Sequence, residues 1–330
     1  MDVASHAALG LSVGYCGFAQ RIGRGGAMLA LAAATLPDLD VFMGIGDEWA
    51  GLQYHRYWTH SLLVVPVLGA ALAAMWWRFG PSKRFALLWA CATTVLVCHC
   101  LLDACTSYGT TLLAPLSNHR FAFDWIGIID PFFTVPLLAG LVVFAVRRRR
   151  GRQMAAQQAV LAGLGLALGY LALGATQHAL ACRLIRAEVA TTGHDIVRAN
   201  AYPQIGSVFL WRLVYQTNHD YYVARTNMLT ARPPVFARAP ISNDDLVRAS
   251  QDHPKVRLFR WFAMEFVRPV TRHVGDQWVV EWHDMRYGWP ADATSSLWWA
   301  VAWFDQDGRL QRVSRVRPSW RRIERMSLYD

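Results

Sequence analysis

Charged residues are scarce in this chain of 330 residues, because only 17% are Asp, Glu, Lys or Arg while 54% are hydrophobic. This composition favours a membrane protein over an ordinary soluble one. Cysteine is absent from residues 183–330, so a disulfide framework is excluded there and packing must stabilise the region. Residues 1–20 lack the basic start of a cleavable signal peptide, and we expect the first hydrophobic segments to remain in the mature chain.

The few charged residues leave four long runs that are nearly free of charge. They occur at residues 61–79, 85–105, 131–146 and 157–181. At a rise of 1.5 Å per residue, a run of about nineteen residues covers roughly 28 Å, the thickness of one hydrocarbon core. Residues 4–20 and 25–36 are shorter and rich in Gly and Ala, which predicts a closely packed helical hairpin that enters the membrane. We therefore expect a mainly α membrane domain of about six hydrophobic helical segments over residues 1–182.

Positive charges lie in alternate loops between these segments. They are Arg21, Arg24, Arg78, Lys83, Arg84, Arg147, Arg148, Arg149, Arg150 and Arg152. Because cytoplasmic loops carry an excess of Lys and Arg, we expect a multi-pass protein of the bacterial inner membrane, with residues 37–60, 106–130 and everything after 182 on the outer side. These cations account for the formal net charge of +10, so no nucleic-acid partner is expected.

The hydrophobic period changes after residue 200. Apolar residues alternate from Phe209 to Tyr215, and the turn-like TNHD and the run YYVA follow, which predicts a hairpin. Asp307 and Gly308 offer the turn of a second hairpin. The segments WVVEWHDMRYG and RLFRWFAMEF are further strand candidates. Residues 183–330 are therefore expected to form a β-rich extracytoplasmic domain that begins with a helical connector near 183–200.

His and Asp residues gather where the hydrophobic runs end, in SHAALG, LPDLD, HRYWTHS, HCLLDACTSYGT and IIDP. The residues concerned are His6, Asp38, Asp40, His55, His60, His99, Asp103 and Asp130. If the runs are membrane helices, these side chains meet at one membrane face, as a metal site requires. His99 and Asp103 are four residues apart and share a helix face, so they can bind one ion.

Each of these residues also has a structural explanation. Asp38 and Asp40 could be solvated carboxylates in a turn, and Asp130 before a proline could simply cap a helix. A lone histidine such as His6 is commonly structural. Arg56 has a bidentate fork that suits a substrate phosphate, and contact with anionic lipid headgroups explains this arginine equally well.

In this order and around these runs, the motifs resemble the YdjM-like family of membrane-bound, metal-dependent hydrolases, bacterial inner-membrane proteins of which some are under LexA control. The resemblance covers most of residues 1–180 and implies a hydrolase. A more distant likeness to zinc-dependent phospholipase C and P1-type nucleases implies ligands at Asp38 or Asp40, at His55 or His60, and at His99 with Asp103. No second His-x-x-x-Asp or His-x-x-x-Glu pair follows Asp103, which favours one or two metal ions over three.

The resulting hypothesis is a membrane-bound metal-dependent hydrolase that acts through a metal-activated water. Its expected metal ligands are His6, Asp38, His55, His60, His99 and Asp103, with zinc as the ion and manganese as the alternative. Arg56 and Asp40 are the expected catalytic residues. A site at headgroup level favours membrane lipids as partners and a lipid-linked phosphoester as substrate. A metal-ion transporter and a non-catalytic envelope scaffold are the competing functions, although the runs carry few ionisable residues near their centres, where a transporter needs them.

Overall fold

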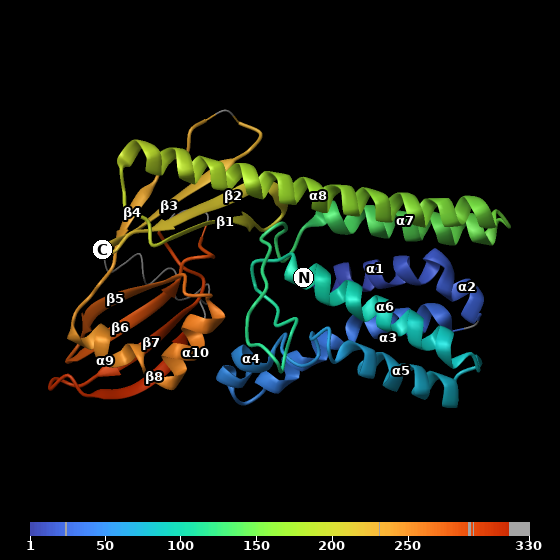
Figure 1. Cartoon of the computed structure of the whole chain (residues 1–330), viewed down its shortest axis with the longest axis horizontal. Coiled ribbons are helices and arrows are strands. Elements are labelled where there is room, and N and C mark those ends of the chain that lie inside the picture. Colours follow the sequence, from blue (N-terminus) through green and yellow to red (C-terminus); the bar gives the residue numbers. More distant parts are fainter. Residues whose placement is uncertain (24, 231, 290–291, 293, 317–330) are drawn as a thin grey trace. The chain divides into compact units, whose positions relative to one another are not determined.

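The structure is a computed structural model that describes residues 1–23, 25–230, 232–289, 292 and 294–316 (Figure 1). These residues form two compact units. The first unit contains residues 1–45, 54–178 and 203–209, and the second contains residues 46–53, 179–202 and the described residues from 210 onwards. The boundary predicted at residue 182 lies inside helix α8 (Gln153–Thr192), which contributes to both units.

The first unit is helical. Its further elements are α1 (Val3–Val13), the π-helix η1 (Gly14–Phe18), α2 (Ala19–Ile22), α3 (Gly26–Thr35), the 3-10 helix η2 (Pro37–Gly44), α5 (Val65–Phe79), α6 (Phe85–Ala104) and α7 (Pro131–Arg149). Pro37 follows α3 directly and starts η2, because a proline is tolerated at the first positions of a helix but not in its interior. This break places the two carboxylates of LPDLD on a short, tighter helix.

Four stretches of the described chain are long and apolar enough to cross a membrane. They are Gly26–Gly44, Phe85–Ala104, Pro131–Arg149 and Gln153–Thr192. The predicted span at 61–79 is shorter than expected, because residues 61–64 form a turn and only the 15 residues of α5 are helical. At 1.5 Å per residue α5 covers about 22 Å, which is less than a hydrocarbon core of about 30 Å. The described residues thus provide four candidate spans and one short apolar helix rather than six spanning segments.

Close helix packing requires glycine at several positions of the first unit. A Cβ atom added at Gly10 of α1 would lie 2.3 Å from the Cβ atom of Ala34 in α3. A Cβ atom at Gly163 of α8 would lie 2.5 Å from the carbonyl oxygen of Pro136 in α7. Such small residues let helix backbones approach each other in a membrane, where packing rather than water exclusion drives association.

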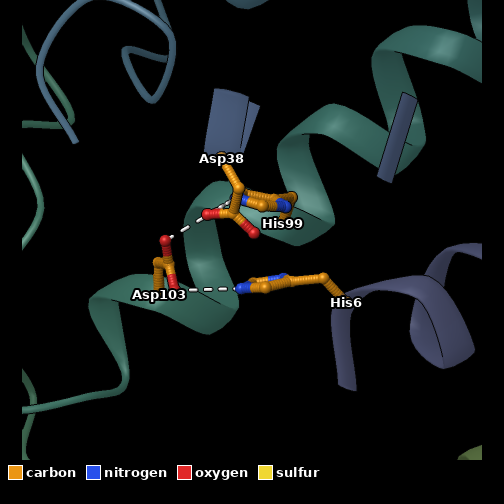
Figure 2. A group of neighbouring side chains, drawn as sticks. All are labelled: His6, Asp38, His99 and Asp103. Atoms are coloured by element: carbon orange, nitrogen blue, oxygen red, sulfur yellow. Dashed lines mark hydrogen bonds and ion pairs between the residues drawn. The ribbon is translucent and has the colours of Figure 1, made fainter. Parts of the chain in front are cut away.

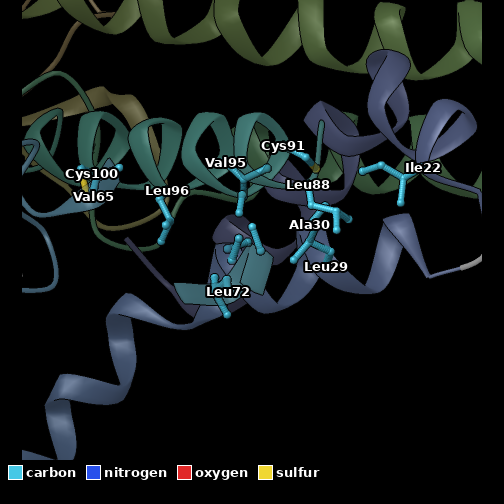
Figure 3. Packing of buried hydrophobic residues seen from close by; sticks show 14 of the residues in the cluster. Ile22, Leu29, Ala30, Val65, Leu72, Leu88, Cys91, Val95, Leu96 and Cys100 are labelled. Carbon is cyan, nitrogen blue, oxygen red and sulfur yellow. The ribbon is translucent and has the colours of Figure 1, made fainter. Parts of the chain in front are cut away.

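The core between α3, α5 and α6 is built of small and branched side chains (Figure 3). Leu29, Leu72, Leu88, Cys91 and Val95 are buried in it. Its position at the middle of α6 fixes the orientation of that helix, and with it the direction in which the residues of the last turn of α6 point. The core therefore supports the cluster described below.

The second unit is rich in β-structure and contains two four-stranded antiparallel sheets. The first sheet has the order β1 (Arg198–Gln204), β2 (Ser207–Gln216), β3 (Asp220–Asn227) and β4 (Ala237–Pro240), and the second has β5 (Val267–Val274), β6 (Gln277–Asp284), β7 (Trp299–Phe304) and β8 (Leu310–Val316). Both predicted hairpins are confirmed. In the first, Tyr215 pairs with Tyr222, and in the second Gly308 has the positive φ of 74° that the turn between β7 and β8 requires.

One strand prediction is wrong. Residues 257–262 of RLFRWFAMEF lie in α10 (Pro254–Phe262), which follows the short helices α4 (Glu48–Tyr54) and α9 (Asp245–Gln251) of the same unit. His253 caps α10 by accepting a hydrogen bond from Lys255 N, and a proline occupies the first helical position. Val256, Phe259 and Phe262 are buried, and their spacing of three residues is helical rather than alternating.

Candidate metal centre

Four separate elements of the first unit bring the predicted His and Asp residues together. His6 comes from α1, Asp38 and Asp40 from η2, and His99 and Asp103 from the last turn and a half of α6. The turn at residues 55–60 supplies His55, Arg56 and His60. All the residues predicted as metal ligands or catalytic groups therefore lie in one neighbourhood.

The core of this neighbourhood is the group formed by His6, Asp38, His99 and Asp103 (Figure 2). One nitrogen or oxygen atom from each residue lies within 4.8 Å of the corresponding atoms of the other three. The imidazole of His6 stacks on that of His99 with ring centroids 3.7 Å apart, and its Nε2 is 3.0 Å from Asp103 Oδ1. His99 Nε2 is 3.6 Å from Asp103 Oδ2 and 3.7 Å from Asp38 Oδ1.

His60 extends the group to five residues. Its Nε2 lies 3.1 Å from His99 Nε2, 3.1 Å from Asp103 Oδ2 and 3.8 Å from Asp38 Oδ1. Two ligand atoms of a tetrahedral zinc ion are about 3.3 Å apart, since each zinc bond is about 2.0–2.1 Å long. The separations around His60 and His99 therefore fit a shared divalent ion, and the mixture of imidazoles and carboxylates is a donor set that zinc accepts.

The outer nitrogen atoms of the two histidines fix the direction of the inner ones. His99 Nδ1 donates a hydrogen bond of 2.8 Å to the carbonyl oxygen of Ala34, and His60 Nδ1 lies 2.9 Å from Thr59 Oγ1 and 3.3 Å from Asp40 Oδ2. With its proton on Nδ1, a neutral imidazole presents the lone pair of Nε2. Two such lone pairs face each other at 3.1 Å, an arrangement that requires a cation or a proton between them.

A positive charge is favoured at this point for a second reason. Burial opposes the charging of His60, but hydrogen bonds with Asp103, Asp38 and Asp40 outweigh burial and raise the pKa of His60 to about 10. A proton and a metal ion therefore compete for the same surroundings.

Asp40 accepts several hydrogen bonds from the turn at residues 55–60. Its Oδ1 accepts a bond of 2.6 Å from His55 Nδ1, while its Oδ2 accepts bonds from Arg56 N at 2.9 Å and from Thr59 Oγ1 at 2.7 Å, in addition to its contact with His60. A carboxylate with this many donors is well suited to hold both histidines in fixed orientations. Sequence reasoning did not assign this role, because the partners lie 15 to 20 residues along the chain from Asp40.

Arg56 faces inward. Its Nη2 atom is 2.9 Å from Asp103 Oδ1, and its Nη1 atom donates to Thr106 Oγ1 at 3.0 Å. The guanidinium lies over the ring of Tyr108, and its side chain is only 4% exposed. The α-amino group of Met1 also contacts Asp103. Asp103 Oδ1 thus faces Arg56, the α-amino group and His6, while Asp103 Oδ2 faces His60 and His99.

The remaining candidates lie apart from the five-residue group. His55 is joined to the neighbourhood by its hydrogen bond with Asp40 and by an edge contact with the ring of His60, and its side chain is 20% exposed. Asp130 caps α7 by accepting a hydrogen bond from Phe132 N. Its two carboxylate oxygens share the single hydroxyl donor of Tyr170, and burial raises the pKa of Asp130. Cys91 and Cys100 are buried in the core of Figure 3 and are not part of the metal-ligand group found among the described residues.

The spans of the helical unit and the buried His and Asp cluster at their ends define a membrane protein with a candidate metal centre. The sequence profile described as "YdjM inner membrane protein" matches residues 1–180, and the chain belongs to this family. It is also similar to the uncharacterized protein YfhP of Bacillus subtilis (strain 168), with 22% identity over 295 residues that cover 87% of each chain. No solved structure matches the chain.

Proposed function

We propose that the protein is a metal-dependent hydrolase that cleaves a phosphoester with an activated water molecule. The observation that supports this proposal best is the convergence of His60 Nε2 and His99 Nε2 on the carboxylates of Asp38 and Asp103. Buried carboxylates and imidazoles are costly without a partner, and their lone pairs point at one position. Packing alone does not account for such an arrangement.

The proposed ligands are Asp38, His60, His99 and Asp103, with His6 as a fifth. When bound there, zinc or manganese would supply Lewis acidity and lower the pKa of water. The chain's own contribution is to hold these ligands in place: the carbonyl oxygen of Ala34 orients His99, and Asp40 orients His60. We therefore assign Asp40 a positioning role in place of the direct catalytic role suggested by the sequence.

His55 is the proposed proton carrier. Its Nδ1 is held by Asp40 at 2.6 Å, and its partly exposed ring leaves Nε2 available for exchange with substrate or solvent. A histidine held by a carboxylate is the commonest group for transferring a proton to a leaving group near neutral pH. The proposal for His55 thus differs from the ligand role that the sequence suggested.

Arg56 is proposed to act through Asp103. A buried carboxylate needs a compensating cation, and the guanidinium at 2.9 Å supplies one while also bonding Thr106. In this arrangement the main role of Arg56 is to keep Asp103 ionised and oriented. Direct binding of a substrate anion, the role suggested by the sequence, is its lesser role.

We also propose that the centre faces the outer side of the inner membrane. Ser5 Oγ lies 2.5 Å from Thr134 Oγ1, so the start of α7 lies beside the helix that carries His6. The cations from Arg147 to Arg152 lie at the opposite end of α7, and such basic turns are retained in the cytoplasm. A reporter fused after Arg150 should report cytoplasm and one fused after Asp330 the outer side, whereas the opposite pattern would contradict this orientation.

The proposed activity is tested with the purified full-length protein in detergent. Zinc or manganese is added, and hydrolysis of bis(4-nitrophenyl) phosphate and of phosphatidylcholine is measured before and after chelation. We expect hydrolysis of at least one ester that is lost with the chelator and in His99→Ala, and retained in the exposed His219→Ala. A protein that retains its metal but hydrolyses neither ester would refute the phosphoesterase assignment.

A further inference from the structure

The outward face of η2 is strongly apolar. Four residues of η2 and the residue that follows it are each at least half exposed, and we call these five the η2 ridge: Leu39, Val41, Phe42, Met43 and Ile45. The same short helix turns Asp40 inward, where this residue is buried. η2 therefore contributes Asp40 to the centre and also presents several exposed apolar side chains.

The most exposed side chains among the proposed ligands and their neighbours His55 and Asp40 lie in η2 or in the turn at residues 55–60. The side chains of His6, His60, His99, Asp40 and Asp103 are at most 1% exposed. Asp38 of η2 is 14% exposed, and His55 in the adjoining turn is 20% exposed. Among these seven residues, an approaching molecule therefore meets Asp38 and His55 first, and Asp38 belongs to the helix that carries the η2 ridge.

Lipid is the partner that this surface fits. The ridge continues α3 within Gly26–Gly44, a stretch apolar and long enough to enter a bilayer, in a member of an inner membrane protein family. Exposed apolar ridges of this kind are unfavourable in water and mark membrane or ligand contacts. Trp58, in the turn that carries His55, is 45% exposed, and tryptophan is enriched at the interface between lipid and water.

We infer that the η2 ridge lies in the lipid leaflet and forms a lateral entrance through which a lipid-borne phosphoester reaches the centre, an inference that rests on the proposed hydrolase function. The acyl chains remain beside the apolar side chains of the ridge. The phosphoester group reaches Asp38 and His55 without leaving the membrane surface. The substrate class is therefore a phospholipid or another lipid phosphoester, as opposed to a freely soluble one.

Lipid contact is tested first, without any need for activity. Benzoylphenylalanine replaces Phe42 in the full-length protein in phosphatidylcholine bilayers, and illumination is followed by mass analysis of the adduct. Val274, an exposed apolar residue at the end of β5, is the control position. We expect lipid adducts from position 42 and none from position 274. Absence of lipid adducts at position 42, or equal yields at both positions, would overturn the inference.

The entrance is tested next by comparing two esters in metal-loaded protein. We expect Phe42→Ser to lower the ratio of phosphatidylcholine to bis(4-nitrophenyl) phosphate hydrolysis by about ten-fold. Contact of one phenylalanine side chain with acyl chains is expected to strengthen lipid binding by about ten-fold or more. Phe79→Ser removes the same side chain from another exposed position, at the end of α5, and should leave the ratio unchanged. An unchanged ratio in Phe42→Ser, or a parent that cleaves only the soluble ester, overturns the entrance alone. A metal-loaded parent inactive on both esters overturns the hydrolase and the entrance with it.

Discussion

Asp40→Asn should weaken metal binding although Asp40 is not itself a proposed ligand. The substitution keeps the shape of the side chain but removes its charge and replaces one acceptor oxygen with an NH2 group. Donors surround both oxygens of Asp40, namely His55 on one side and Arg56, Thr59 and His60 on the other. Whichever way the amide turns, its NH2 group meets at least one donor, and the group that steadies His60 is weakened.

The expected loss is about ten-fold in metal affinity, near 1.4 kcal/mol, because removal of a partner that orients a ligating histidine typically costs 10 to 100-fold. The measurement is competition between the purified protein and a calibrated zinc chelator. Asp47→Asn is the matched control, because Asp47 is exposed and caps α4 through Trp49 N, a role that asparagine also performs. Equal zinc affinity in Asp40→Asn and the parent would refute the positioning role.

Three further outcomes follow. Arg56→Ala should lower both metal affinity and melting temperature, because Asp103 would lose its cation, and Arg56→Lys should restore only part of each; an inactive Arg56→Ala protein with full metal content would instead support direct substrate binding. Gly163→Leu should destabilise the packing of α7 and α8 by about 1–3 kcal/mol in detergent unfolding, whereas Gly165→Leu in the same helix, with no atom within 4 Å of an added Cβ, should not. Burial lowers the pKa of His283. Since the unfolded chain then binds the proton more readily, stability should fall as pH drops below about 6.5, and His283→Asn should flatten this dependence in thermal melts at several pH values.

The coarse organisation of the chain follows from its hydrophobic pattern. Charge-free runs predict the helices of the first unit, and alternation with Asp307-Gly308 predicts the hairpin of β7 and β8, because both signals are local. The prediction of a strand at RLFRWF is wrong because so short a pattern of aromatic residues fits both the two-residue period of a strand and the 3.6-residue period of a helix. The cap at His253 and the proline after it are the signals that identify α10.

The residues of the centre could be found from the sequence, but their roles could not. The positions of His and Asp at the ends of apolar runs point to one membrane face. However, only the fold shows that Asp40 bonds four donors from the turn at residues 55–60, and that Arg56 turns inward to Asp103. These contacts join residues 15 to 47 positions apart, so no local pattern records them.

Metal content tests the central claim most directly. The full-length parent protein, purified without chelators and dialysed against zinc or manganese, should retain about one or two ions per chain by elemental analysis. His99→Ala and Asp103→Ala should each lose most of this metal, while His219→Ala, exposed in the second unit, should retain it. A folded parent that holds no more metal than His99→Ala and Asp103→Ala would contradict the existence of a metal centre.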